Sequence, residues 1–199
     1  MSAEEWRMRE LVVARCRNAW PDARIIHELS LDYARCRIDI AAVRPASLIA
    51  IEIKASTDGF KRLRAQLRGF SRVAEGVIVA VAPTMWARRA AALREAIDDI
   101  SPDIGIWVVC ADTGTITVER QRGSREIWTA LLFDLLHKNE LVEIARQYGV
   151  PGGAVEARAD LAARLGNALT SFDARAASFA ALRRRAAVRA DSDPPVEGG

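Results

Sequence analysis

The sequence predicts an α/β protein whose N-terminal sheet domain is followed by a helical module. Short apolar runs typical of strands alternate with helical periodicity as far as residue 122. Beyond residue 123 no strand-like run recurs, and every pattern has the helical period. Half of the 199 residues are hydrophobic (50%), which is enough to bury a core. We therefore expect an α/β domain over residues 1–122, a helical module over 125–188 and a disordered tail over 189–199.

The segments of the first domain follow from periodicity and from turn residues. An amphipathic helical period starts at Ala3, and Pro21 ends it. Asp58 is a candidate N-cap for a second helix, which carries an apolar stripe. The continuous apolar run Val77–Ala82 is typical of a strand that is buried on both faces. The expected helices are residues 3–20, 58–73 and 84–97, and the expected strands are 24–29, 37–43, 48–55, 77–82, 104–111 and 116–119.

The remaining segments of the chain are expected to be helical. Helical patterns with short breaks cover residues 127–137, 141–148, 155–169 and 172–188. The last of them is followed by Asp191–Gly199, whose Asp, Ser, Pro and Gly content favours disorder. The tryptophans Trp20, Trp86, Trp107 and Trp128 are interpreted as core or boundary residues and not as a base-stacking platform.

Composition excludes several classes of protein. The three cysteines and two histidines are scattered, so neither a disulfide framework nor a zinc site is expected. No run is long and apolar enough to span a membrane and no signal peptide precedes the domain, so we expect a cytoplasmic protein without a membrane partner. Only three of the 29 basic residues are lysines. This arginine bias has two equal explanations, a GC-rich genome or contacts with phosphate groups.

Two neighbouring strands carry the residues that point to chemistry. Alternate residues of a strand share a face, so Glu52 and Lys54 point together. By the same rule Asp39 points away from Ile38 and Ile40. A hairpin that turns at residues 44–47 would place Asp39 beside Glu52 and Lys54.

Two adjacent carboxylates in a buried strand need a proton or a divalent cation, because like charges repel and burial is costly. Carboxylate and carbonyl oxygens suit Mg²⁺ or Mn²⁺, and a nearby lysine can orient water or stabilise charge on a phosphate. This is the equipment of phosphodiester hydrolysis. The alternative is an ordinary solvated strand face carrying Glu52 and Lys54.

These residues resemble the PD-(D/E)XK nuclease superfamily, and in particular a largely uncharacterised family of small bacterial proteins. The resemblance covers about residues 24–120 and rests on an ordered set: Glu28-Leu29, Arg37–Ala41, Glu52–Ser56, Gln66, Phe70-Ser71 and Val77–Val81. It implies a restriction-endonuclease-like fold, a mixed sheet flanked by helices. Phe70 stands where many members have tyrosine, so one hydroxyl contact is lost.

The resemblance also implies roles for individual residues. Asp39, Glu52 and the backbone carbonyl of Ile53 would bind Mg²⁺ or Mn²⁺. Lys54 would act on the water, and Gln66 would orient the substrate. Glu28 either completes the metal shell or pairs with an arginine.

Basic residues are expected to contact nucleic acid. Arg64, Arg68 and Arg72 are spaced by four and share one helix face, which would meet phosphates or be merely solvated. Lys61 and Arg62 precede them. The C-terminal helices weakly resemble a SAP-type DNA-binding motif, with a plain helical bundle as the alternative. Its candidate phosphate contacts are Arg146, Arg158 and Arg164.

The expected function is therefore that of a metal-dependent nuclease, with DNA favoured over RNA as substrate. The first alternative is a catalytically silent nuclease-fold subunit that binds DNA in a repair, defence or mobile-element complex. The second is a structural protein in which the Glu52–Lys54 strand face is ordinary surface. A homodimer or larger complex is compatible with cleavage of both strands.

Overall fold

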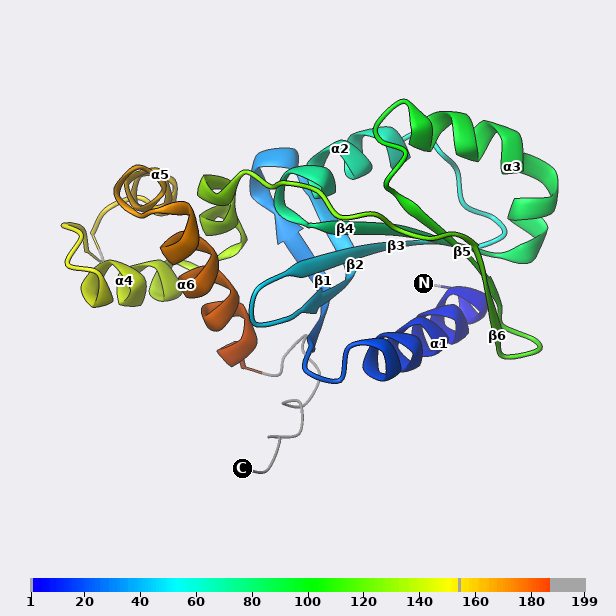
Figure 1. Ribbon diagram of the computed structural model, residues 1–199, viewed down its shortest axis with the longest axis horizontal. Helices are drawn as coiled ribbons and strands as arrows, with labels where there is room; N and C mark the ends of the chain where they lie inside the picture. The colour runs from blue at the N-terminus through cyan, green and yellow to red at the C-terminus, as the bar shows by residue number, and fades with distance from the viewer. Residues whose placement is uncertain (1, 154, 187–199) are drawn as a thin grey trace.

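The computed structural model describes residues 2–153 and 155–186, and within them a single mixed sheet carries helices on both faces (Figure 1). Its six strands lie side by side in chain order. They are β1 (Arg24–Leu31), β2 (Cys36–Val43), β3 (Leu48–Lys54), β4 (Gly76–Val81), β5 (Gly105–Cys110) and β6 (Thr115–Arg120). The predicted α/β class is confirmed.

The order of connections explains the mixed sheet. The 3₁₀ helix η1 (Asp32–Ala34) joins β1 to β2 and a turn at residues 44–47 joins β2 to β3, and both pairs are antiparallel. The pairs β3–β4 and β4–β5 are parallel, because α2 (Leu63–Val73) and α3 (Pro83–Asp98) cross between them. The hairpin β5–β6 closes the sheet with an antiparallel edge strand, as predicted.

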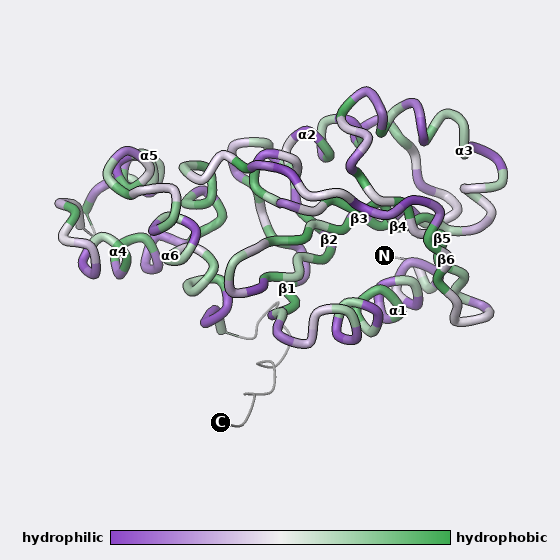
Figure 2. The backbone as a smooth tube through the Cα atoms, viewed as in Figure 1, coloured by the Kyte–Doolittle hydropathy of each residue, from purple (hydrophilic) through white to green (hydrophobic). Residues whose placement is uncertain are grey.

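Two hydrophobic clusters hold the layers together, one on each face of the sheet. Helix α1 (Ala3–Ala19) packs Met8, Val12 and Cys16 against one face. Helices α2 and α3 and the C-terminal helices cover the other face. Figure 2 shows the hydrophobic residues concentrated along the central strands. No helix in the described part of the chain is both long and apolar enough to cross a bilayer.

The C-terminal helices share a continuous core with the sheet. They are the 3₁₀ helix η2 (Thr129–Leu135), α4 (Lys138–Gln147), α5 (Arg158–Ala168) and α6 (Ser171–Arg184). Phe133 and Phe179 belong to the same hydrophobic cluster as the sheet residues on the face opposite α1. The α-helix predicted over residues 127–137 is thus wrong in type and length, because only a short 3₁₀ segment forms there. The predicted tail at 189–199 lies outside the described residues.

A second error concerns the start of α2. The helix begins at Leu63, five residues after the predicted N-cap Asp58. The Asp58 carboxylate instead accepts a hydrogen bond from the Ala55 amide (2.9 Å) and so closes a turn directly after β3. Competition of this kind between a local turn and a helix start is typical of aspartate.

The hairpin β1–β2 is irregular at one position, and this irregularity shapes the site. Glu28 has a left-handed backbone conformation (φ 54°), and the regular ladder skips it and Asp39, which lies opposite. On either side of Asp39, the two isoleucines of β2 lie on different faces of the sheet. Ile40 packs in the hydrophobic cluster against α1, whereas Ile38 packs in the cluster on the opposite face. The prediction that Ile38 and Ile40 share a face is therefore wrong, because the alternation of β2 breaks at Asp39.

Candidate active site

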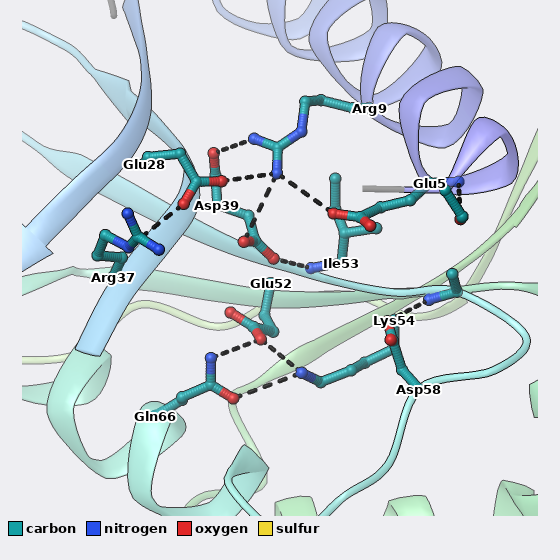
Figure 3. A network of polar contacts seen from close by, with 12 residues as sticks. Glu5, Arg9, Glu28, Arg37, Asp39, Glu52, Ile53, Lys54, Asp58 and Gln66 are labelled. Carbon is teal, nitrogen blue, oxygen red and sulfur yellow. Dashed lines mark hydrogen bonds and ion pairs between the residues drawn. The ribbon is translucent and has the colours of Figure 1, made fainter.

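Strand β3 buries an acid and a base side by side. Glu52 is only 2% exposed, and Lys54 is also buried. The Lys54 Nζ donates to Glu52 Oε1 (2.6 Å), and Gln66 Nε2 on α2 donates to the same oxygen (2.7 Å). We call these three residues the Glu52 cluster (Figure 3). Their burial rules out the interpretation of this strand face as ordinary solvated surface.

The Glu52 carboxyl has an incomplete set of partners. Burial and, after it, the charge of Asp39 raise its pKa to about 8, against the opposing effect of Lys54 and Gln66. Its second oxygen, Oε2, is buried and has no hydrogen-bond partner. An orphaned carboxylate oxygen in a native protein calls for an explanation, and a bound proton or cation supplies one.

A second cluster lies on the other side of β3 and is built around an arginine from α1. Arg9 Nη2 donates to Glu28 Oε1 (2.9 Å) and lies 3.6 Å from Asp39 Oδ1. Its Nη1 donates to the backbone carbonyl of Asp39 (2.6 Å). We call Arg9, Glu28 and Asp39 the Arg9 cluster (Figure 3). Glu5 (3.8 Å from Arg9) and Arg37 (3.5 Å from Glu28) lie at its edge.

Asp39 links the two clusters through the backbone of β3. The ladder between β2 and β3 ends at the pair Ile40–Ile51, so no ladder pair joins Asp39 to Glu52. Its Oδ2 instead accepts a hydrogen bond from the Ile53 amide (2.7 Å). The N–H and C=O of a strand residue point to the same side, so the Ile53 carbonyl faces the Asp39 edge as well.

The surroundings of Asp39 shift the pKa of its carboxyl in opposite directions. Burial raises the pKa of its carboxyl, and the hydrogen bond from Ile53 and the Arg9 guanidinium lower it. Glu28 raises this pKa and Lys54 lowers it, so both clusters act on Asp39. The two clusters lie apart in Figure 3, but their charges are coupled, because residues of both clusters shift the pKa of Asp39 and that of Glu52.

Glu28 and Asp39 of the Arg9 cluster and all three residues of the Glu52 cluster line one pocket of about 780 Å³. Its wall holds acids beside the arginines Arg35, Arg37 and Arg62. A substrate in this pocket would meet carboxylates and cations at the same time. That combination suits a phosphodiester that is approached by a metal-bound water.

The donor set suits a hard cation, with one restriction. Asp39, Glu52 and the Ile53 carbonyl are oxygen ligands of the kind that Mg²⁺ and Mn²⁺ prefer, and Glu52 Oε2 is an oxygen without a partner. The restriction is that no group of three or more His, Cys, Asp or Glu side chains is arranged around a common ion position within residues 2–153 and 155–186. Of the two roles open to Glu28, the structure shows the pairing with arginine.

The arginines of the predicted nucleic-acid interface divide into paired and unpaired groups. Arg64 lies 2.9 Å from Asp99 on α3, Arg158 lies 2.6 Å from Asp32, and Arg164 donates to Glu156 (2.6 Å). These three arginines are held in ion pairs within the chain. Within residues 2–153 and 155–186, no carboxylate pairs with the remaining members of the predicted set, which are all exposed: Lys61, Arg62, Arg68, Arg72 and Arg146.

Sequence reasoning missed Arg9, the centre of one cluster. Its signal was present, because Arg9 lies within the apolar stripe of α1 between Met8 and Val12, where a charge needs a buried partner. The departure at Phe70 also has a structural explanation. Phe70 is fully buried in the hydrophobic core, and the nearby backbone carbonyl of Gly69 accepts from the Tyr33 hydroxyl instead.

Comparison with known proteins gives a family. The family model for bacteriophage P4 protein cII matches residues 3–192. The protein cII of Enterobacteria phage P4 is 28% identical over 132 residues, which cover 65% of this chain and 47% of that protein. The match thus spans about half the length of this curated relative, and no solved structure matches the chain. The chain belongs to the bacteriophage P4 protein cII family.

Proposed function

We propose that this protein is a divalent-metal-dependent nuclease that hydrolyses phosphodiester bonds, with DNA favoured over RNA. The observation that carries the proposal is the Glu52 carboxylate. One of its oxygens is held by Lys54 and Gln66, and the other is buried without a partner. It lies where the β2–β3 ladder ends beside Asp39. A mixed sheet flanked by helices is consistent with the restriction-endonuclease-like fold that the motifs imply.

The residues divide the work of hydrolysis among themselves. Asp39, Glu52 and the Ile53 carbonyl would hold Mg²⁺ or Mn²⁺, which when bound lowers the pKa of water and neutralises phosphate charge. The Lys54 ammonium is fixed by Glu52 and Gln66 and donates a hydrogen bond to the attacking water or to a phosphate oxygen. Water adds to phosphorus and releases a proton to solvent, the bond to the leaving oxygen breaks, and that oxygen takes a proton from solvent.

One observation favours the alternative of a silent nuclease-fold DNA-binding subunit. Arg9 already satisfies the carboxylates of Glu28 and Asp39, as a metal ion would in an active enzyme. In a silent subunit Arg9 would stay paired with Glu28 and Asp39 under all conditions. In a nuclease Asp39 would bind the cation even though Arg9 lies beside it.

A cleavage assay tests the proposal. Supercoiled plasmid, linear duplex and single-stranded DNA would be incubated with Mg²⁺, Mn²⁺, Ca²⁺ or EDTA. We expect cleavage that requires Mg²⁺ or Mn²⁺ and falls at least about 100-fold in Lys54→Met, because an ammonium that orients water or stabilises phosphate charge is lost. Lys61→Met, an exposed lysine nearby, should raise the substrate concentration needed and leave the saturating rate intact.

The contrary outcomes are distinct. DNA retention without cleavage under every metal condition would favour the silent subunit. Cleavage that persists in both Lys54→Met and Glu52→Gln would mean that a contaminating nuclease or another site is responsible.

A further inference from the structure

Trp128 is unusually exposed for a tryptophan that the structure holds firmly. It is 62% exposed, whereas the sequence predicted a core or boundary position. Its backbone amide donates to the Arg72 carbonyl at the end of α2 (2.8 Å), so the segment is anchored there. The Arg72 guanidinium carbon lies 5.0 Å from the centre of the Trp128 ring. The ring is thus presented to solvent from a fixed position.

A second exposed aromatic residue follows from the neighbouring helix. Phe172, in the first turn of α6, is 80% exposed. The residues next to the two aromatics are in contact, since Thr129 Oγ1 donates to Ser171 Oγ (3.2 Å). Trp128 and Phe172 therefore come from distant parts of the sequence to one area of the surface.

The same area carries positive charge that is free to contact a partner. Arg68 and Arg72 are exposed and one helical turn apart, and no carboxylate in the described part of the chain pairs with either. Arg64, on the same face of α2, is in contrast held by Glu95 and Asp99. We call Trp128, Phe172, Arg68 and Arg72 the aromatic–arginine surface.

We propose that the aromatic–arginine surface binds a single-stranded stretch of nucleic acid, whose unpaired bases stack on Trp128 and Phe172 and whose phosphates contact Arg68 and Arg72. Aromatic side chains beside arginines are the combination that binds unpaired bases without sequence preference. The class of partner rests on the proposed nuclease function. The surface and the pocket share α2, since Arg72 lies six residues, about 9 Å along the helix axis, from Gln66.

The test is a binding measurement in EDTA, where no cleavage interferes. Fluorescence anisotropy would follow a labelled single-stranded oligonucleotide and a duplex of the same sequence. Trp128→Ala should weaken binding of the single strand by about 5-fold to 150-fold, because one stacked base is lost. Trp128→Phe should retain most of the affinity. Arg68→Ala should reduce the slope of log affinity against log salt by about 0.7.

Trp6 supplies the matched control, since it is also an exposed tryptophan (50%) but lies on α1. Trp6→Ala should bind like the wild type. The proposal is overturned if Trp128→Ala binds the single strand as the wild type does, if Trp6→Ala loses as much, or if the duplex loses as much as the single strand. Binding that depends on Trp128 in a protein that cuts nothing would refute the nuclease and leave this surface standing.

Discussion

The Glu52 cluster and the Arg9 cluster lie on opposite sides of β3 and stabilise their carboxylates in different ways. Glu28 and Asp39 share one guanidinium and remain partly accessible to water. Glu52 is almost completely buried and relies on one ammonium and one amide, which serve the same oxygen. The forked guanidinium of an arginine can pair with two carboxylates at once, whereas the compact ammonium of a lysine acts as a single point charge.

This difference makes Glu52 the carboxyl group that we expect to respond most to protons and metal ions. The pKa of Glu52 is raised to about 8, so its carboxyl binds a proton near neutral pH unless a cation replaces that proton. Asp39 stands between the clusters, bonded to Ile53 and close to Arg9. A cation bound by Glu52 and Asp39 together would therefore join two clusters that are separate in this structure.

The largest expected effect breaks the Arg9 cluster. Arg9→Met removes the partner of two carboxylates, and loss of one member of a buried ion pair costs about 3–5 kcal/mol of stability. Urea unfolding measures the loss. Arg7→Met, an exposed arginine on the same helix, is the matched control and should change stability by less than about 0.5 kcal/mol. Equal losses in both variants would show that the cluster contributes no stability.

The second prediction sharpens the contrast in protonation. Because the pKa of Glu52 is higher in the folded protein than its ordinary 4.5, the folded state binds more protons than the unfolded chain between about pH 4.5 and 8. Stability should therefore fall as pH rises through this window, by at most about 1.4 kcal/mol per pH unit for one group. Denaturant midpoints recorded at several pH values measure this slope.

Glu52→Gln should flatten the slope, while the exposed Glu10→Gln should reproduce the wild-type curve. Asp39, whose pKa is also raised, leaves a residual slope of the same sign. An unchanged slope in Glu52→Gln would mean that Glu52 is already ionised across this range.

A third prediction tests how tightly α2, which carries Gln66 of the Glu52 cluster, packs against the β1–β2 hairpin. A Cβ on Gly69 of α2 would lie 2.8 Å from the Ala34 Cβ and 3.4 Å from the Cys36 Sγ. Gly69→Ala should push α2, and with it Gln66, away from the β1–β2 hairpin and cost about 1–3 kcal/mol. Gly59→Ala, with open space around its Cβ, should not. Thermal unfolding of both variants decides whether α2 is packed this tightly.

The smallest effect concerns the far face of α2. Arg64→Ala removes exposed ion pairs with Glu95 and Asp99 and should cost about 0.2–1 kcal/mol. The loss should shrink in high salt, which screens exposed charges. A salt-independent loss above 2 kcal/mol would indicate that Arg64 has a packing role.

The regular parts of the fold could be predicted because they depend on local patterns. Apolar runs located all six strands, and the hairpin turn at residues 44–47 fell where Pro45 indicated it. The failures lie where tertiary contacts override local signals. Asp58 closes a turn instead of starting a helix, and residues 129–135 form a 3₁₀ segment under α5 and α6.

The candidate site could be predicted only in part. Spacing along β3 correctly placed Glu52 and Lys54 on one face, whereas the expectation that Gln66 lies beside them came only from the resemblance. The left-handed conformation of Glu28 and the break at Asp39 have no signature in strand alternation, so the sequence wrongly predicts that Ile38 and Ile40 share a face. Arg9 comes from a helix 30 residues away from Asp39, and only the fold brings the two together.

Calorimetric titration with Mn²⁺ tests most directly whether one cation joins the two clusters. Wild type, Asp39→Asn, Glu52→Gln and the double variant would be titrated at pH 8 in the absence of DNA. The account predicts one site in the wild type, a large loss of affinity in each single variant and little further loss in the double variant, because both residues hold the same ion. Wild-type protein that binds no Mn²⁺, or single variants that bind as the wild type does, would contradict it.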